Sequence, residues 1–231
     1  MLNSRLAIIP ARGGSKRLPR KNILTFRGLP LLAHSIRTAQ DCGLFARIVV
    51  STEDAEIGAI AQEHGAQVVW RPAHLATDTA TLEAAALHTL DALETEGATF
   101  DLLCLLMPNC PLRLPSDLCA SLWQLEAEGA DYLMSVVDYG WLKPYWALEE
   151  TPAGLHRYFD TAVGWANGEA PRALVCPSGA IRWARVEAFR RDRTFYGPGL
   201  RGYRLPWERS ADIDDADDLA RAEILARLLE I

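Results

Sequence analysis

The sequence predicts an α/β domain built around a mainly parallel β-sheet. Short aliphatic and β-branched runs recur along the chain, and segments with apolar residues three and four positions apart lie between them. The runs are nearly continuous in apolar residues, as strands buried on both faces require. A sheet covered by helices on both faces satisfies both observations. With 231 residues, 49% of them hydrophobic, we expect residues 1–231 to form one domain with one sizeable core.

The expected strands and helices follow one another in chain order. Strands are expected at "LAIIP" from Leu6, "RIVVS" from Arg47, "AQVVW" from Ala66, "DLLCLLM" from Asp101 and "YLMSVV" from Tyr132. Helices are expected over residues 31–42, 54–64, 81–96, 115–128 and 216–229. In an open α/β sheet, ligands bind outside the carboxyl ends of the strands. We therefore look for a site in the loops that follow the strands.

An irregular segment interrupts this pattern from about residue 141 to 171. It begins "WLKPYWALEETPAGLHRYF" and is rich in aromatic residues, Pro and Gly. We expect an irregular or hairpin-like insertion here. Regular structure is expected to resume at "SGAIRWARVEAF", from Ser178.

Composition excludes several classes of partner. The net charge of −6 argues against a nucleic-acid surface or a membrane-binding face, because both partners favour an excess of Lys and Arg. No apolar run is long enough to cross a bilayer. The five cysteines are scattered and form no C-x-x-C pair, so we expect reduced thiols and a cytoplasmic protein.

A basic loop follows the first expected strand. The segment "PARGGSKRLPRKN", residues 10–22, surrounds Gly13 and Gly14 with cations, and the glycines would let backbone amides turn toward an anion. A solvated charged loop is the alternative, since neither G-x-G-x-x-G nor a P-loop motif is present. The chain has only three lysines, and two of them, Lys16 and Lys21, are in this loop. A compact point charge suits a phosphate whose charge grows during a reaction.

An acidic segment, "SADIDDADDLARAE", precedes the last expected helix. Helix capping and the helix dipole account for Asp215, Asp217 and Asp218. Asp212 and Asp214 differ, because an extended Asp-x-Asp projects both carboxylates to one side of the backbone. Two such oxygen ligands would suit Mg²⁺.

The segment "IIPARGGSKRLPRKNI" resembles the N-terminal signature of the CMP-sialate synthetases. These cytidylyltransferases activate sialic, legionaminic, pseudaminic and related nine-carbon sugar acids. Further matches cover nearly the full length: "RP" at Arg71 with "LATDTA" at Leu75, "PLR" at Pro111, "SGAI" at Ser178 and "DIDDADDL" at Asp212. The resemblance implies a three-layer, Rossmann-like nucleotidyltransferase fold with a small dimerisation insertion, and a homodimer.

The resemblance also implies a reaction and a set of site residues. The anomeric hydroxyl of the sugar acid attacks the α-phosphate of CTP, pyrophosphate leaves, and Mg²⁺ is the cofactor. The residues with implied nucleotide contacts are Arg12, Gly13, Gly14, Ser15, Lys16, Asn22, Arg71 and Ala80. The implied catalytic residues are Lys21, Arg12 and Asp214, with Lys21 closest to the reacting phosphate. Implied sugar-acid contacts are Lys143, Met107 and Arg113, and implied metal ligands are Asp212 and Asp214.

The match to this family weakens at a few positions. The segment "LLMPNCPLR" places Met107, Asn109 and Cys110 where the "LLQPTSPLR" of sialate and legionaminate enzymes has Gln, Thr and Ser. Arg17 replaces a Gly that is common in sialate enzymes. The resulting "SKR-PRKN" form is closer to that of the pseudaminate branch. Cys110 is interpreted as a buried thiol rather than a nucleophile, because direct transfer needs no covalent intermediate. Lys143 has a surface or interface role as its alternative.

Two other functions stay open at this point. One is a cytidylyltransferase for 3-deoxy-manno-octulosonate or its 8-amino analogue, although the double glycine of "ARGGSKR" counts against it. The other is a regulatory nucleotide-binding module that has lost catalysis, which the retention of Asp212 and Asp214 disfavours.

Overall fold

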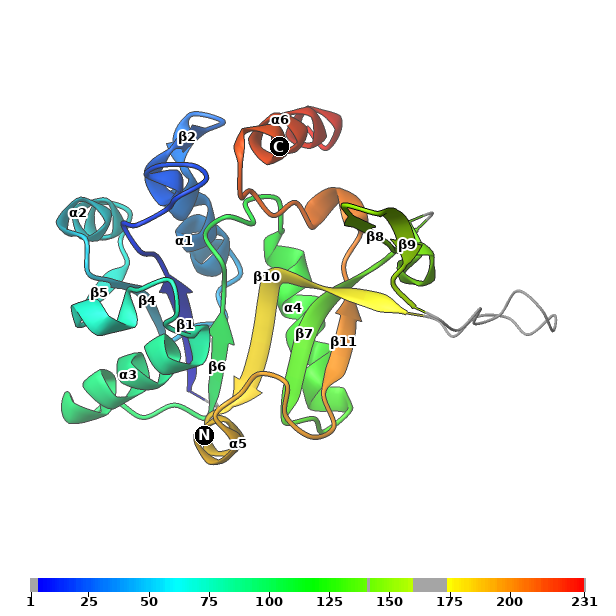
Figure 1. Ribbon diagram of the computed structural model, residues 1–231. Coiled ribbons are helices and arrows are strands. Elements are labelled where there is room, and N and C mark those ends of the chain that lie inside the picture. The colour runs from blue at the N-terminus through cyan, green and yellow to red at the C-terminus, as the bar shows by residue number, and fades with distance from the viewer. Residues whose placement is uncertain (1–3, 141, 160–173, 231) are drawn as a thin grey trace.

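A seven-stranded sheet forms the centre of the computed structural model, which describes residues 4–140, 142–159 and 174–230 (Figure 1). The strand order is β11-β7-β10-β6-β1-β4-β5. The strands are β1 (Arg5–Pro10), β4 (Arg47–Thr52), β5 (Gln67–Trp70), β6 (Leu102–Leu105), β7 (Tyr132–Asp138), β10 (Val175–Arg185) and β11 (Arg201–Arg204). Strand β10 runs antiparallel to β6 and β7, whereas the other neighbouring strands are parallel. The expectation of a mainly parallel sheet is confirmed.

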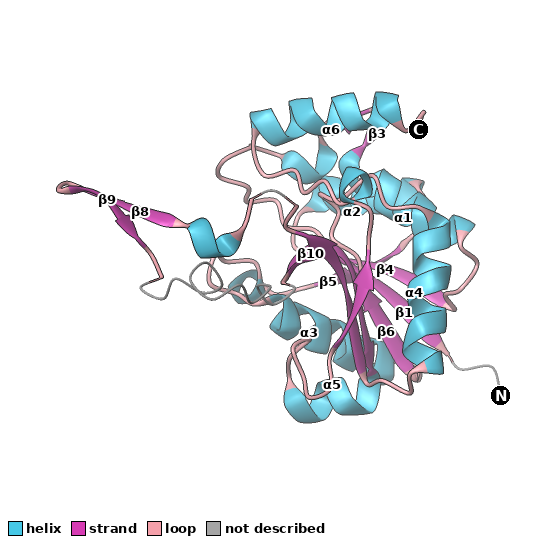
Figure 2. Ribbon diagram, turned by 90° about the vertical axis from the view of Figure 1, so that its right-hand side faces the viewer, coloured by secondary structure: helices cyan, strands magenta, loops and turns pink. Residues whose placement is uncertain are grey.

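Helices cover both faces of this sheet. The helices in the described residues are α1 (Leu31–Asp41), α2 (Ala55–Glu63), α3 (Leu82–Thr95), α4 (Pro115–Ala127), α5 (Val186–Asp192) and α6 (Ala216–Leu228), of which α6 packs in a separate cluster with Phe26 and Ile213. Helices α1, α2 and α4 pack on one face, and α3 and α5 pack on the other (Figure 2). The five expected helix ranges agree with α1, α2, α3, α4 and α6 to within one residue at each end, whereas α5 was not singled out as a helix.

Strand β1 shows why the apolar runs are continuous. Leu6 and Ile8 belong to the core under α3 and α5, and Ala7 and Ile9 belong to the core under α1, α2 and α4. All four side chains are fully buried. Because successive side chains of a strand point to opposite faces, a strand between two helical layers needs apolar residues at every position.

Strand β11 was not expected from the sequence. Its segment, "RGYR", lies at the edge of the sheet and pairs only with β7. Three of its four residues are exposed, so it lacks the apolar run that marks the inner strands. An edge strand with an exposed face needs no such run.

A β-hairpin stands where the insertion was expected. Strands β8 (Leu148–Thr151) and β9 (Gly154–Arg157) pair with each other outside the main sheet and extend away from the body of the molecule (Figure 2). Trp146, Leu155 and Tyr158 lie along this hairpin and are more than half exposed. The rest of the expected insertion, residues 141 and 160–171, lies outside the described residues.

The remaining elements are small or lie against the main body. A short hairpin, β2 (Thr25–Phe26) with β3 (Leu29–Pro30), packs near α6. Across the described residues, no helix has both the length and the apolar character needed to span a bilayer.

Candidate active site

A cavity of about 580 Å³ lies at the carboxyl ends of β1, β5 and β6. Its walls come from the loop after β1, the loop between β5 and α3, the loop after β6 and the segment before α6. Most of the residues singled out in the sequence line it: Arg12, Ser15, Lys16, Lys21, Asn22, Arg71, Ala80, Met107, Asp212 and Asp214. The fold therefore brings the basic loop and the Asp-x-Asp segment, some 190 residues apart, to one place.

Four of the sequence-predicted residues lie elsewhere. Gly13 and Gly14 line a neighbouring cavity of about 440 Å³. Lys143 precedes a 3-10 turn (Pro144–Trp146) on the projecting segment. Arg113 is buried beneath the loop that follows β6.

Gly13 has a different role from the one expected of it. Its N–H donates to Glu53 Oε1 at 2.8 Å, so this amide is already committed to a carboxylate at the end of β4. A Cβ at this position would overlap the carboxylate of Asp54. Gly13 thus allows close approach of the loop to the start of α2, and its amide points to Glu53. A Cβ at Gly14 would meet nothing within 4 Å.

Arg20 holds the far end of the basic loop. Its backbone is left-handed, with φ of 57°, and its guanidinium pairs with Asp54 at 2.5 Å and with Glu56. Asp54 also caps α2 by accepting the N–H groups of Glu56 and Ile57. The hydrogen bond from Arg20 holds the pKa of Asp54 below its usual value. The loop is therefore tied to the N-terminus of α2 on the side away from the larger cavity.

Arg71 and Asn22 form the back of the larger cavity. The Arg71 side chain is 4% exposed, and both its Nε and an Nη lie 3.1 Å from Glu53 Oε2. Asn22 is also buried, and its Nδ2 donates to the carbonyl of Arg12 at 3.0 Å. Glu53 thus joins Arg71 to the amide of Gly13, so the back of the cavity and the basic loop share one carboxylate.

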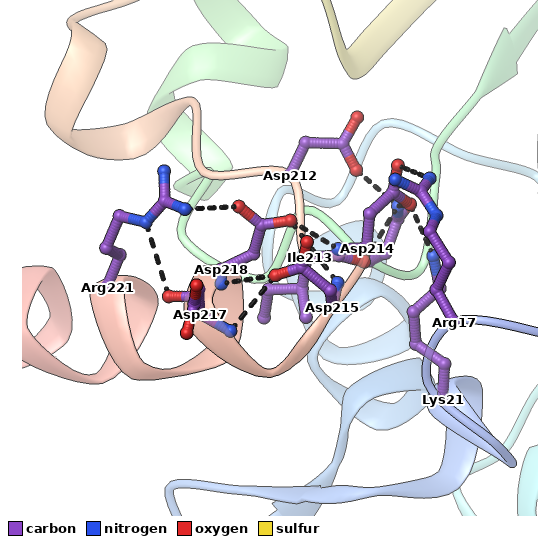
Figure 3. Close-up of polar contacts among 10 residues, drawn as sticks. Arg17, Lys21, Asp212, Ile213, Asp214, Asp215, Asp217, Asp218 and Arg221 are labelled. Atoms are coloured by element: carbon purple, nitrogen blue, oxygen red, sulfur yellow. Dashed lines mark hydrogen bonds and ion pairs between the residues drawn. The ribbon is translucent and has the colours of Figure 1, made fainter.

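The Asp-x-Asp segment meets both the basic loop and the loop after β6 (Figure 3). Asp214 Oδ1 lies 2.7 Å from Lys21 Nζ, and Asp214 also pairs with Arg17. The Nδ2 of Asn109 donates to Asp212, to the Ile213 carbonyl at 3.2 Å and to Asp214 at 3.4 Å. One amide therefore links the two carboxylates.

The pKa values of the two carboxylates are shifted in opposite directions. Desolvation by the surrounding segments raises the pKa of Asp212 even though the residue keeps an exposed edge, and the charge of the neighbouring Asp214 adds to this effect. Burial acts in the same direction on Asp214, but the hydrogen bond from Lys21 and the charge of Arg17 outweigh it and lower its pKa. Asp214 is thus held as an anion by the basic loop, and a nearby cation would favour the charged form of Asp212 as well.

The donor set at this position fits a magnesium ion. Among the residues that the structure describes, no three His, Cys, Asp or Glu side chains form a complete metal site. Mg²⁺ is commonly held by one or two carboxylates together with substrate phosphates, so Asp212 and Asp214 in the wall of this cavity are enough protein ligands. Asn109 Oδ1 is buried and has no hydrogen-bond partner among the described residues, which leaves one further oxygen at this place.

The other acidic residues of this segment shape the start of α6. Asp215 is the N-cap and accepts the N–H groups of Asp217 and Asp218 at 3.0 Å (Figure 3). Asp218 in turn accepts the N–H groups of Asp214 and Asp215. These carboxylates have the capping role expected from the sequence.

Arg113 supports the loop after β6 from below. Its guanidinium donates to the carbonyls of Met107, Cys110 and Ala180 at 2.9–3.2 Å and to the Ser35 hydroxyl. The side chain is buried and does not line the cavity, so this placement differs from the contact with the sugar acid that the resemblance implied. Arg113 acts by fixing the loop that carries Met107.

Cys110 is inaccessible in the same loop. Its side chain is fully buried, and burial raises the pKa of the thiol far above its ordinary value. A buried, protonated thiol is a poor nucleophile, which agrees with the interpretation of Cys110 as structural.

Comparisons with known proteins agree with this geometry. The family model described as "Cytidylyltransferase" matches residues 6–140. The chain belongs to the cytidylyltransferase family. Over 228 residues it is 41% identical to the CMP-N,N'-diacetyllegionaminic acid synthase of Legionella pneumophila, with 96% of each chain covered. Over 226 residues it is 29% identical to a pseudaminic acid cytidylyltransferase of Campylobacter jejuni, again with 96% of each covered.

A solved structure has the same fold as this cytidylyltransferase. It is a CMP:2-keto-3-deoxy-manno-octonic acid synthetase complexed with CTP, and the two chains superpose with a TM-score of 0.70. The match covers 99% of this chain and all of the other, at 16% sequence identity. The likeness confirms the three-layer nucleotidyltransferase fold.

Two acidic residues of the cytidylyltransferase site were missed in the sequence. Glu53 directly follows β4, and Asp78 lies in the loop between β5 and α3 and pairs with Arg12. A carboxylate at the carboxyl end of a parallel strand is a usable signal for Glu53. Asp78 lies within "LATDTA", but nothing local shows which cation it meets.

Proposed function

We propose that this enzyme transfers CMP from CTP to a nonulosonic, nine-carbon sugar acid and releases pyrophosphate. The observation that carries the proposal is the single cavity in which the loop cations face Asp212 and Asp214. The relatives named for legionaminic and pseudaminic acids match along nearly their whole length, which supports the substrate class.

Each wall of the cavity has a role in this proposal. Arg12, Ser15 and Lys16 hold the triphosphate, and Lys21 stabilises the charge that develops on the transferring phosphate. Such catalysis consists mainly of positioning and electrostatic stabilisation, so cations fixed before the reaction are the main requirement. Lys21 meets it, because its side chain is only 15% exposed and its ammonium is held by Asp214.

Magnesium is the proposed cofactor, with Asp212 and Asp214 as its protein ligands. When bound, the ion neutralises charge on the phosphates and so helps pyrophosphate to leave. Asn109 keeps the two carboxylates together through its amide. Lys21 and Arg17 keep Asp214 ionised, the state in which it can ligate a cation.

The cytidine lies, in this proposal, against Asn22, Arg71 and Ala80. We expect Arg71→Ala to raise KM for CTP with a much smaller effect on kcat, because base recognition contributes equally to substrate and transition state. Steady-state kinetics with CTP as the varied substrate measure both constants. A wild-type KM in this variant would remove Arg71 from the cytidine site.

The proposed sugar acid is one other than N-acetylneuraminic acid. Met107 lines the cavity where sialate and legionaminate enzymes have Gln, and a thioether cannot donate the hydrogen bond that an amide offers. Pyrophosphate release with CTP, Mg²⁺ and a panel of sugar acids tests both the function and this preference. We expect kcat/KM for pseudaminic or legionaminic acid to exceed that for N-acetylneuraminic acid, and the reverse order would contradict the assignment.

The same panel separates the two alternatives. Activity only with 3-deoxy-manno-octulosonate or its 8-amino analogue would make this chain an eight-carbon-acid enzyme, the class of its structural neighbour. CTP binding without turnover on any acid would indicate a regulatory module. The likeness to the octonic acid enzyme is at 16% identity and supports the fold, whereas the closer sequence matches support the nine-carbon class.

A cytoplasmic homodimer completes the proposal. The projecting hairpin exposes Trp146, Leu148 and Leu155, each more than half accessible, and exposed apolar residues on an extension are suited to a partner surface. Lys143 lies at the start of this extension, and we retain it as a candidate contact for the sugar carboxylate.

A further inference from the structure

Asp78 pairs with two cations of the basic loop. Its Oδ1 lies 2.8 Å from an Nη of Arg12, and its Oδ2 pairs with Lys16 Nζ. Asp78 lies between a 3-10 turn (Ala73–Leu75) and α3. These are the cations to which the proposed function assigns the triphosphate. A carboxylate therefore stands where the proposed function expects phosphate oxygens.

Asp78 also lies in the wall between the two cavities. The cavities of about 580 and 440 Å³ share Arg12, Ser15, Lys16, Thr77 and Asp78 as lining residues. The ion pairs of Asp78 with the two cations thus help to form the partition between them. An anion that binds both cations competes with this carboxylate, because like charges on the same cations repel.

Two other acidic partners of the loop, Glu53 and Asp54, have structural tasks. Glu53 accepts the N–H of Gly13, and Asp54 caps α2 as well as holding Arg20. Within the described part of the chain, the Asp78 carboxylate accepts no backbone N–H and meets only Arg12 and Lys16. Its side chain is 47% exposed, so it can turn into water at little cost.

We propose that Asp78 competes with the phosphates of CTP and of pyrophosphate for Arg12 and Lys16. The inference rests on the proposed function. Before the reaction, the carboxylate keeps the two cations together and weakens ground-state binding of the nucleotide. After it, the carboxylate returns to the same cations and favours release of pyrophosphate. Product release limits the turnover of many enzymes, so such a competitor can raise throughput.

The test is calorimetric binding of CTP and of inorganic pyrophosphate, each with Mg²⁺, to wild type and to Asp78→Asn. The variant keeps the shape of the side chain and removes its charge. We expect both ligands to bind about three- to tenfold more tightly, the effect of losing two exposed ion pairs that binding must break. Product inhibition by pyrophosphate should strengthen by the same factor.

Glu56→Gln is the matched control. Glu56 also pairs with an arginine of this loop, Arg20, but it lines neither cavity, and Asp54 still holds Arg20 in its absence. Removing its charge should leave both dissociation constants unchanged. Asp78→Ala is a second variant, which must shift binding in the same direction as Asp78→Asn.

The outcomes separate this inference from the proposed function. Equal or weaker binding of pyrophosphate in both Asp78 variants would overturn the competition and make Asp78 a residue that orders the cations for the ligand. Tighter binding in Glu56→Gln as well would reduce the effect to general charge and overturn it too. A wild-type protein that binds CTP but transfers CMP to no sugar acid would refute the function, while the binding comparison would still decide the role of Asp78.

Discussion

Replacing Lys21 with Ala is expected to lower kcat about 100-fold or more, the usual effect of removing one fixed donor to a developing charge. Lys21 Nζ is held 2.7 Å from Asp214 in a largely buried position, so its charge is in place before the reaction begins. KM for CTP should change less, because Arg12 and Lys16 remain to hold the phosphates. Steady-state kinetics with saturating sugar acid measure the effect.

Lys21→Arg provides the companion variant. It keeps the charge but replaces a compact ammonium by a planar fork, so we expect only partial recovery of kcat. Asp214 keeps Arg17 as a partner in both variants, which limits indirect effects on the acidic segment. Wild-type turnover in Lys21→Ala would exclude this residue from the chemistry.

Replacing Asp212 or Asp214 with Asn is expected to reduce activity sharply while the fold persists. Asn keeps the shape of the side chain and one oxygen but removes a charge from the proposed magnesium site. The apparent affinity for Mg²⁺ should therefore fall at least about tenfold. Raising the Mg²⁺ concentration should therefore restore part of the rate. Activity as a function of Mg²⁺ concentration, with calorimetric titration of the ion, measures both effects.

Asp217→Asn is the control for this pair. Asp217 lies one turn further on, at the exposed start of α6, and its side chain does not line the cavity. We expect nearly unchanged activity and, at most, a slight loss of stability from the helix dipole. Similar losses in all three variants that Mg²⁺ does not relieve, with lower melting temperatures, would show that the acidic segment is structural and that the metal is held elsewhere.

The sequence predicts those parts of the fold whose cause is local. A strand between two helical layers needs an unbroken apolar run, so β1 and β6 are recognisable, and helix caps such as Asp54 mark where helices begin. Strand β11 is not recognisable in the sequence, because an edge strand with one neighbour and an exposed face can be polar. The direction of β10 also depends on the whole sheet rather than on its own residues.

In the site, too, local motifs can be predicted from the sequence, whereas contacts between distant segments cannot. The loop cations and the Asp-x-Asp segment are visible as motifs, and the fold brings them to one cavity. Their partners are not visible, because Glu53 meets Gly13 across 40 positions and Asp78 meets Arg12 across 66. The burial of Arg113 likewise follows from three carbonyls on two separate segments. Pairings of this kind are properties of the assembled fold.

The amide of Asn109 has a thermodynamic consequence for the whole chain. It joins the loop after β6 to carboxylates more than 100 positions later, and Ile213, between those carboxylates, is buried with residues of α6. The unfolded chain has no such arrangement, so an ion that binds both carboxylates binds the native state alone. By mass action, such an ion would stabilise the folded protein by an amount that grows with its concentration relative to its Kd. Packing of α6 against the domain and binding of an ion at Asp212 and Asp214 would thus be linked equilibria, and each would make the other more favourable.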